Sequence, residues 1–135
     1  MSVVGSTQLR QTRIDLRFTS NSEAISAARH SLDEFKGLLP PEKLEDVRFV
    51  VSELVTNSVR HARLSPHDQI SLTVTVSAGS VCGRVCDPGP GFEVPSEPGP
   101  RSDLSGGWGL SIVETISDRW GVERNRHTCV WFEID

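Results

Sequence analysis

The strict alternation of apolar and polar residues over positions 70–76 limits the possible folds of this chain more than any other segment. A period of two is typical of a β-strand with one buried and one solvated face. The turn residues Ala78-Gly79-Ser80 follow, and residues 81–86 can return as a hairpin partner. Because a short hairpin joins antiparallel strands, we expect a largely antiparallel sheet.

Two helices are predicted before this hairpin, after a first strand at residues 13–18. The first should run from residue 22 to residue 38 or 39, since Ser20 and Glu23 have the spacing of a capping box. Its inward-facing residues would be Ala24, Ala27, Ala28, Leu32 and Phe35. Pro40-Pro41 should start the second helix, because proline suits a first helical turn. The apolar stripe of this helix comprises Leu44, Val47, Val51, Leu54, Val55, Val59 and Ala62.

The remaining chain predicts a loop, a third helix and a closing hairpin. Residues 87–107 hold five of the eight prolines, so we expect a functional loop or lid there. A helix should follow over about 108–118, and strands over 122–126 and 129–134. Hairpins with helices on one side predict an α+β fold, a two-layer α/β sandwich in which helices cover one face of the sheet. We expect a flexible N-terminus over 1–11 and a single domain over 12–135.

Charge and composition exclude some classes of function. The formal charge of -4 argues against direct binding of nucleic acid, which favours a basic surface. No apolar run approaches the roughly 20 residues of a membrane span, and residues 1–11 do not resemble a signal peptide. We therefore expect a cytoplasmic protein. The odd count of three cysteines suits free thiols in a reducing compartment, with Cys82 and Cys86 on one strand face as buried apolar side chains.

The second predicted helix carries polar residues whose chemistry suits a magnesium nucleotide. Glu53 and Asn57 lie four positions apart, so their side chains share a helix face, and Arg60 and His61 follow one turn later. A neutral amide oxygen can ligate Mg²⁺, and a carboxylate can accept a proton from an attacking hydroxyl. Taken alone, the pair also fits an ordinary solvated helix face.

Two glycine-rich turns follow. Asp87 comes directly after a predicted strand, where its carboxylate can accept a hydrogen bond from an exocyclic amine such as that of adenine. Gly89 and Gly91 would let the backbone approach a ligand closely. The second turn includes Gly107 and Gly109, and it opens a helix whose free N–H groups can hold phosphate. A plain proline-glycine turn and a purely steric role for the glycines are the alternatives.

In combination, these segments resemble the GHKL superfamily of ATP-binding proteins, and within it the anti-sigma-factor serine kinases. Residues 53–62 are similar to the N box, 87–91 to the first glycine box and 107–110 to the second. The resemblance implies a Bergerat-type ATP-binding fold, with ATP and Mg²⁺ as cofactors. It implies that Glu53 is the catalytic base, that Asn57 binds the metal and that Asp87 reads adenine. The other implied binding residues are Arg60, His61, Gly89, Gly91, Gly107, Gly109, Leu110 and Thr128.

The resemblance also implies a function in bacterial regulation. Such a kinase phosphorylates a serine or threonine of an anti-anti-sigma protein and thereby controls a sigma factor, and relatives of this kind often form homodimers. The alternative is a module that binds partner proteins in a nucleotide-dependent way without transferring phosphate. The chain departs from the family at His127, where a glycine commonly precedes the threonine represented here by Thr128.

Overall fold

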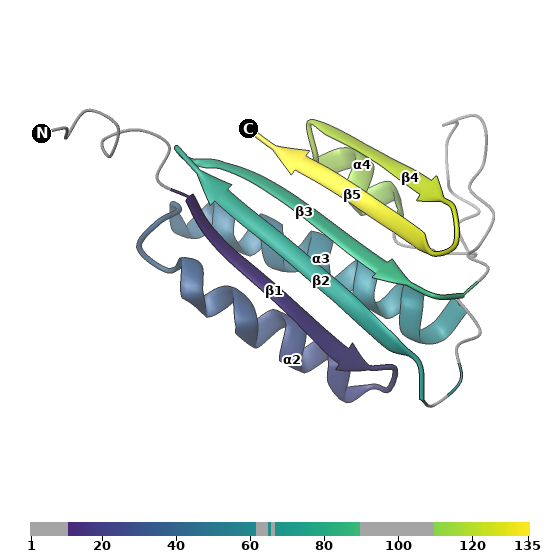
Figure 1. Cartoon of the computed structure of the whole chain (residues 1–135). Coiled ribbons are helices and arrows are strands. Elements are labelled where there is room, and N and C mark those ends of the chain that lie inside the picture. The colour runs from purple at the N-terminus through teal and green to yellow at the C-terminus, as the bar shows by residue number, and fades with distance from the viewer. Residues whose placement is uncertain (1–10, 62–64, 66, 90–109) are drawn as a thin grey trace, which may run out of the picture.

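A five-stranded sheet forms one layer of the protein (Figure 1). The computed structural model describes residues 11–61, 65, 67–89 and 110–135. All neighbouring strands are antiparallel, in the order β1-β2-β3-β5-β4. This confirms the expected antiparallel sheet. The strands are β1 (Gln11–Thr19), β2 (Gln69–Ser77), β3 (Ser80–Asp87), β4 (Arg119–Arg124) and β5 (Thr128–Ile134).

Helices form the second layer and cover one face of the sheet, which confirms the α+β two-layer sandwich (Figure 1). The core lies between the layers, because the inward residues of β2 and β3 alternate with solvent-facing ones and meet the apolar stripe of the long central helix. Among the described residues, no helix combines the length and the apolar character needed to cross a membrane. The helical elements are α2 (Glu23–Ser31), the 3₁₀ helix η1 (Leu32–Phe35), α3 (Pro41–His61) and α4 (Leu110–Ile116).

The first helix is shorter than the sequence predicted. The α-helix ends at Ser31, and η1 continues from it, so that Leu32 and Phe35 are both fully buried. Residues three apart lie on the same side of a 3₁₀ helix, which explains the tighter turn. Gly37 then adopts a φ of 86°, a left-handed conformation that ends the helical path.

The start of this helix also differs from the prediction. Ser20 does not cap it; the Asn21 side-chain oxygen accepts the Glu23 backbone N–H at 2.9 Å. Asn is as good an N-terminal hydrogen-bond acceptor as Ser, and here it lies closer to the first turn. Ala27 is exposed rather than buried, because the helix turns Ala24 and Ala28 into the core and packs a half-buried Ile25 against it.

The C-terminal elements follow the predicted order with shifted bounds. The described part of the third helix ends at Ile116 rather than 118, because Asp118 already belongs to the sheet edge: its N–H donates to the Glu133 carbonyl at 2.8 Å. Strand β4 accordingly begins at Arg119 and ends at Arg124, earlier than the predicted 122–126. Strand β1 begins at Gln11, inside the predicted flexible segment; residues 1–10 lie outside the described part.

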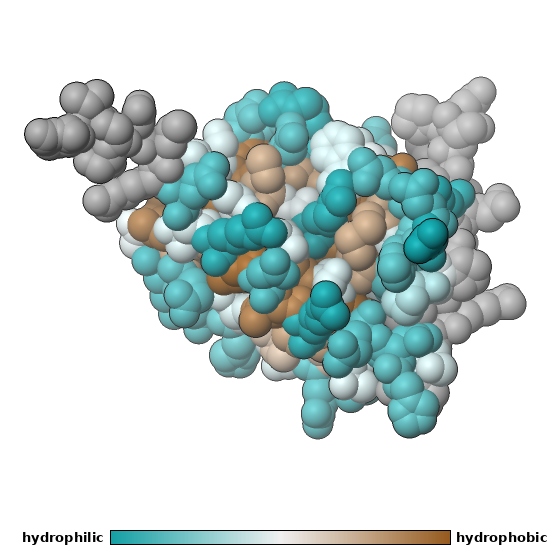
Figure 2. Space-filling view, in the orientation of Figure 1, coloured by the Kyte–Doolittle hydropathy of each residue, from teal (hydrophilic) through white to brown (hydrophobic). Residues whose placement is uncertain are grey.

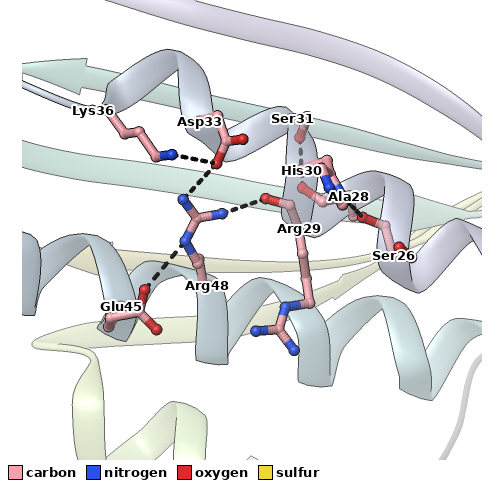
Figure 3. Close-up of polar contacts among 9 residues, drawn as sticks. All are labelled: Ser26, Ala28, Arg29, His30, Ser31, Asp33, Lys36, Glu45 and Arg48. Carbon is pink, nitrogen blue, oxygen red and sulfur yellow. Dashed lines mark hydrogen bonds and ion pairs between the residues drawn. The ribbon is translucent and has the colours of Figure 1, made fainter.

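A hydrogen-bonded cluster connects α2 and η1 to α3 (Figure 3). The Arg48 side chain, only 12% exposed, donates to the Arg29 carbonyl and to the Asp33 carboxylate, each at 2.6 Å. The hydrogen bond from Arg48 is the largest cause that holds the pKa of Asp33 below its ordinary value, and the charge of Lys36 adds to it. One guanidinium therefore joins the C-terminal end of α2 to the middle of α3, since its planar fork can serve several acceptors at once.

The sheet face opposite the helices is not covered by another described element. In Figure 2 this face is mainly hydrophilic, with apolar patches between the polar side chains. A shallow cavity of about 490 Å³ lies on it, lined in part by Arg13, Arg84, Glu123 and Trp131. The Arg84 and Glu123 side chains form an ion pair across this surface at 2.7 Å.

Candidate functional site

The buried carboxylate of Asp87 is the centre of the candidate site. Asp87 is the last residue of β3 and is 3% exposed. A charged side chain that is buried in this way needs hydrogen-bond partners to compensate for the lost water. The Ser58 hydroxyl on α3 donates to Asp87 Oδ2 at 2.6 Å, and the Gly89 backbone N–H donates to Asp87 Oδ1 at 2.9 Å. One donor comes from the helix layer and the other from the turn after the strand, so both oxygens have fixed positions.

The electrostatics of Asp87 reflect its burial. Loss of contact with water raises the pKa of the Asp87 carboxyl, and the hydrogen bonds from Ser58 and Gly89 oppose that rise. The positive charge of His127 also lowers the pKa, while the Asp68 carboxylate raises it. Carboxyl groups whose pKa is shifted by burial and by specific hydrogen-bond partners are frequent in functional sites.

Thr128, another predicted residue of the nucleotide site, lies directly opposite Asp87 in the sheet. It is the first residue of β5, it is 3% exposed, and its Cα is the register partner of the Asp87 Cα. The Thr128 hydroxyl donates to the Gly89 carbonyl at 3.2 Å. Asp87, Gly89 and Thr128 therefore form a connected group at one end of the sheet, where β3 ends and β5 begins.

The N-box residues lie on the helix that faces this group. Asn57 is 2% exposed and immediately precedes Ser58, whose hydroxyl contacts Asp87. Glu53 lies one turn earlier on α3 and is half-buried. The structure thus places the predicted metal ligand next to the helix position that touches the predicted adenine-reading carboxylate, although 30 residues separate Asn57 from Asp87 in the chain.

The other predicted residues are brought together less fully. Arg60 is exposed on α3, and His61 is the last residue of that helix. Leu110 is the first residue of α4 and is 9% exposed. Its side chain is therefore part of the core, and only its backbone would be available to a nucleotide. The predicted site glycines Gly91, Gly107 and Gly109 lie outside the described residues, as does most of the 87–107 loop.

These residues fit a magnesium nucleotide in chemical terms. An ionised carboxylate has about four acceptor positions, and the described donors to Asp87 are two, so its oxygens retain capacity to accept an amine N–H. The side-chain oxygen of an asparagine is the hard, neutral ligand type that Mg²⁺ accepts. Asp87 and Thr128 would hold the base, and Asn57 would hold the metal.

Ser58 is a residue of the candidate site that the sequence did not indicate. It is 4% exposed, and its hydroxyl fixes the orientation of the Asp87 carboxylate. The signal was its position: a small hydroxyl residue directly after Asn57, on the helix face that turns toward the sheet. Only the packing of α3 under β3 shows that this hydroxyl meets a carboxylate 29 residues further along the chain.

The prediction of free thiols is wrong for Cys86 and Cys129, and the prediction that Cys82 and Cys86 are buried is wrong for both. Cys86 and Cys129 form a disulfide between β3 and β5, and Cys82 is a free thiol on the exposed side of β3. The antiparallel register sets Cys86 directly opposite Cys129, a proximity that the linear sequence does not reveal. The side chains of Cys86 and Cys129 are half-buried rather than fully buried.

Known proteins resemble this chain over most of its length. Residues 18–134 match the family described as histidine kinase-like ATPase domain. An anti-sigma F factor from Clostridium botulinum (strain Eklund 17B / Type B) is 32% identical over 125 residues, covering 86% of this chain and 87% of the relative. The serine-protein kinase RsbW of Listeria monocytogenes serotype 4a (strain HCC23) is 30% identical over 119 residues, covering 78% and 76%.

The fold is also found in a solved structure. The crystal structure of the RsbU and RsbW domains of Rv1364c from Mycobacterium tuberculosis superimposes with a TM-score of 0.69 at 17% identity. The match covers 91% of this chain and 32% of that longer chain. With the family match over nearly the whole length and relatives at 30% identity or more, the chain belongs to the GHKL family of histidine kinase-like ATPases, in the group of anti-sigma-factor serine kinases.

Proposed function

We propose that this protein is an ATP-dependent serine/threonine protein kinase that phosphorylates an anti-anti-sigma partner and thereby regulates a sigma factor. The observation that carries the proposal is the buried Asp87 carboxylate, held by Ser58 next to Asn57 and paired with Thr128. Burial raises the pKa of this carboxyl, and carboxyl groups perturbed in this way cluster at functional sites, which supports the proposal. The names of the relatives, an anti-sigma F factor and a serine-protein kinase, support the choice of reaction and partner.

In this mechanism each residue has a limited task. Asp87 accepts a hydrogen bond from the amine of adenine, while Ser58 and Gly89 keep its oxygens in position. The Asn57 side-chain oxygen would ligate Mg²⁺, which would neutralise phosphate charge when bound. Glu53, one turn away on the same helix face, accepts the proton of the partner's serine or threonine hydroxyl as that oxygen attacks the γ-phosphate, the bond to the β–γ bridging oxygen breaks and ADP leaves. Positioning and charge stabilisation account for most of the rate in such transfers.

The role of Glu53 is tested by Glu53→Gln, which keeps the size of the side chain and removes the basic carboxylate. We expect ADP affinity to stay within about twofold, and phosphate transfer to the partner to fall by about 10²- to 10⁴-fold, the usual contribution of a general base. Glu42→Gln, an exposed position in the first turn of the same helix, is the matched control and should transfer phosphate normally. Transfer by Glu53→Gln at the rate of the control would exclude Glu53 as the base.

The role of Asp87 is tested by Asp87→Asn, with nucleotide affinity measured by calorimetry in the presence of Mg²⁺. A hydrogen bond to a charged group contributes about 1.5–3 kcal/mol, so affinity should fall by about 10- to 100-fold. The free energy of unfolding without nucleotide should not fall, because the substitution removes a buried charge whose ionised form is disfavoured. Unchanged ADP affinity in a folded variant would reject the adenine assignment.

The nucleotide-dependent binding module gives a different result in the same assays. If ATP binding changes the affinity of the wild-type protein for its partner, but no phosphate is transferred to that partner, the binding-module hypothesis holds and the kinase hypothesis is rejected. The homodimer stays a prediction, and sedimentation of the purified chain measures it directly.

A further inference from the structure

The disulfide lies one residue from the candidate nucleotide site. Cys86 and Cys129 are register partners on β3 and β5, with Cα atoms 4.0 Å apart. The next pair along the same two strands is Asp87 and Thr128, and it is the last pair of this ladder. The disulfide therefore joins β3 to β5 covalently at the end of the sheet where the carboxylate proposed to bind adenine lies.

The two sulfur atoms and the carboxylate lie on opposite faces of the sheet. Successive side chains on a strand point to opposite faces. Asp87 and Thr128 are buried, whereas the neighbouring Cys86 and Cys129 are half-buried. Both cysteines line a cavity of about 590 Å³, together with Arg17, His67 and Asp87 itself. A small thiol in this cavity can therefore reach the disulfide from the face of the sheet that no described helix covers.

From this juxtaposition we propose that Cys86–Cys129 is a thiol–disulfide exchange site whose oxidation state sets the nucleotide affinity of the neighbouring Asp87–Thr128 pair. The inference rests on the proposed function, because the nucleotide is the one proposed there. The co-reactant is a dithiol, either a small molecule or a protein, that reaches the cavity on the open face. Cys82, exposed on β3 four residues before Cys86, is outside the exchange.

The reaction balances as an ordinary exchange. A thiolate of the dithiol attacks one cysteine sulfur, the Cys86–Cys129 bond breaks, and the departing cysteine sulfur takes up a proton. The second thiol of the dithiol then attacks the mixed disulfide and releases the other cysteine as a thiol. Two electrons and two protons pass from the dithiol, which becomes a disulfide, to the two cysteines. The reverse sequence, with an oxidised dithiol, restores the link.

The coupling to the site follows from the position of the link. Without it, the terminal Asp87–Thr128 pair is held by hydrogen bonds alone, and the ends of strands open more easily than their centres. Only molecules in which the Asp87–Thr128 end of β3 and β5 is paired hold Asp87, Gly89 and Thr128 in the arrangement described above; these molecules are called closed. If about a third to a tenth of the reduced protein is closed, the apparent dissociation constant rises by about three- to tenfold.

The test compares the oxidised and reduced full-length chain by calorimetry with Mg-ADP, after the number of thiols available to iodoacetamide has been counted by mass spectrometry. We expect one reactive thiol and tight binding in the oxidised form, and three thiols with about three- to tenfold weaker binding in the reduced form. Reoxidation should restore the affinity. Cys82→Ser should respond to reduction as the wild type does, whereas Cys86→Ser/Cys129→Ser should bind weakly under both conditions. Equal affinity of the two wild-type forms, or three reactive thiols before reduction, would overturn the inference.

A second measurement does not depend on nucleotide binding. Hydrogen exchange of the Asp87 and Thr128 backbone amides should accelerate on reduction, while amides in the middle of β2, such as Val74, should keep their protection. Unchanged exchange at the Asp87–Thr128 end would overturn the coupling. If neither form binds ADP, the proposed function fails, and the exchange data alone then decide whether the disulfide controls this end of the sheet.

Discussion

The hydrogen bond from Ser58 to Asp87 predicts how the site depends on a residue that contacts no reacting atom in the proposed mechanism. Ser58→Ala removes the donor to Asp87 Oδ2 and leaves one carboxylate oxygen buried with one partner fewer. A hydrogen bond to a charged group contributes about 1.5–3 kcal/mol, and the loss of one partner exposes the full desolvation cost of the other. We therefore expect the free energy of unfolding to fall by about 2 kcal/mol at pH 7.

The assay is urea unfolding, followed by fluorescence of the three tryptophans. With a slope of about 2 kcal/mol per molar urea, the midpoint should move down by about 1 M at unchanged slope. The matched control is Ser52→Ala on the same helix. The Ser52 hydroxyl is buried without a hydrogen-bond partner among the described residues, so its removal should be neutral or stabilising by up to about 1 kcal/mol.

The dependence on pH distinguishes this bond from simple packing. Burial raises the pKa of Asp87, and the bond from Ser58 lowers it because it favours the ionised carboxylate. The destabilisation by Ser58→Ala should be complete above the raised pKa of Asp87. It should shrink as the pH falls through that pKa, because the carboxyl is then protonated in both proteins. A loss that equals the Ser52→Ala value, or that stays constant with pH, would refute the reasoning.

Three further predictions concern the scaffold. Gly83→Ala should lower the free energy of unfolding by about 1–3 kcal/mol in the same urea assay, because the added Cβ would lie 2.3 Å from the fully buried Phe132 ring. Gly121→Ala should lower the free energy of unfolding by less, because the added Cβ would lie 2.8 Å from the ring of the half-buried Trp131, which can shift toward solvent. An equal loss in the two variants would show that burial of the neighbouring ring does not decide the effect. Arg48→Met should raise the pKa of Asp33, measured by NMR titration of its carboxyl carbon, toward the ordinary value, because the hydrogen bond that lowers it most is removed. A pKa that stays low in Arg48→Met would assign the shift to Lys36 instead.

Local patterns were enough to predict the secondary structure of the hairpin at 70–86 and of the long helix from Pro41. The period-two alternation of the first and the continuous apolar stripe of the second each come from burial of one face, which is the strongest local signal. Helix ends were harder to predict. The change from α2 to η1 at Leu32 depends on the need to bury Phe35 against other elements, and that need is not a local property.

Some features of the candidate site could likewise be predicted from local sequence, and others could not. The residue types of Glu53, Asn57 and Asp87 suggested nucleotide chemistry, because each side chain suits one part of a magnesium nucleotide, and the combination of the three motifs and their resemblance to a known family selected that prediction over a solvated helix face and a plain turn. Neither the contact of Ser58 with Asp87 nor the opposition of Thr128 to Asp87 was accessible in this way. Both depend on which strands are neighbours and on where the helix packs beneath them.

The amino-acid sequence alone therefore determined the elements of this protein and the identity of its chemical groups, since periodicity and side-chain chemistry act over a few residues. The tertiary structure alone decided the order β3-β5-β4, and with it which cysteines are joined. Strand pairing links residues 43 positions apart, and such pairs are selected by the burial of the whole sheet against its helices rather than by any local pattern.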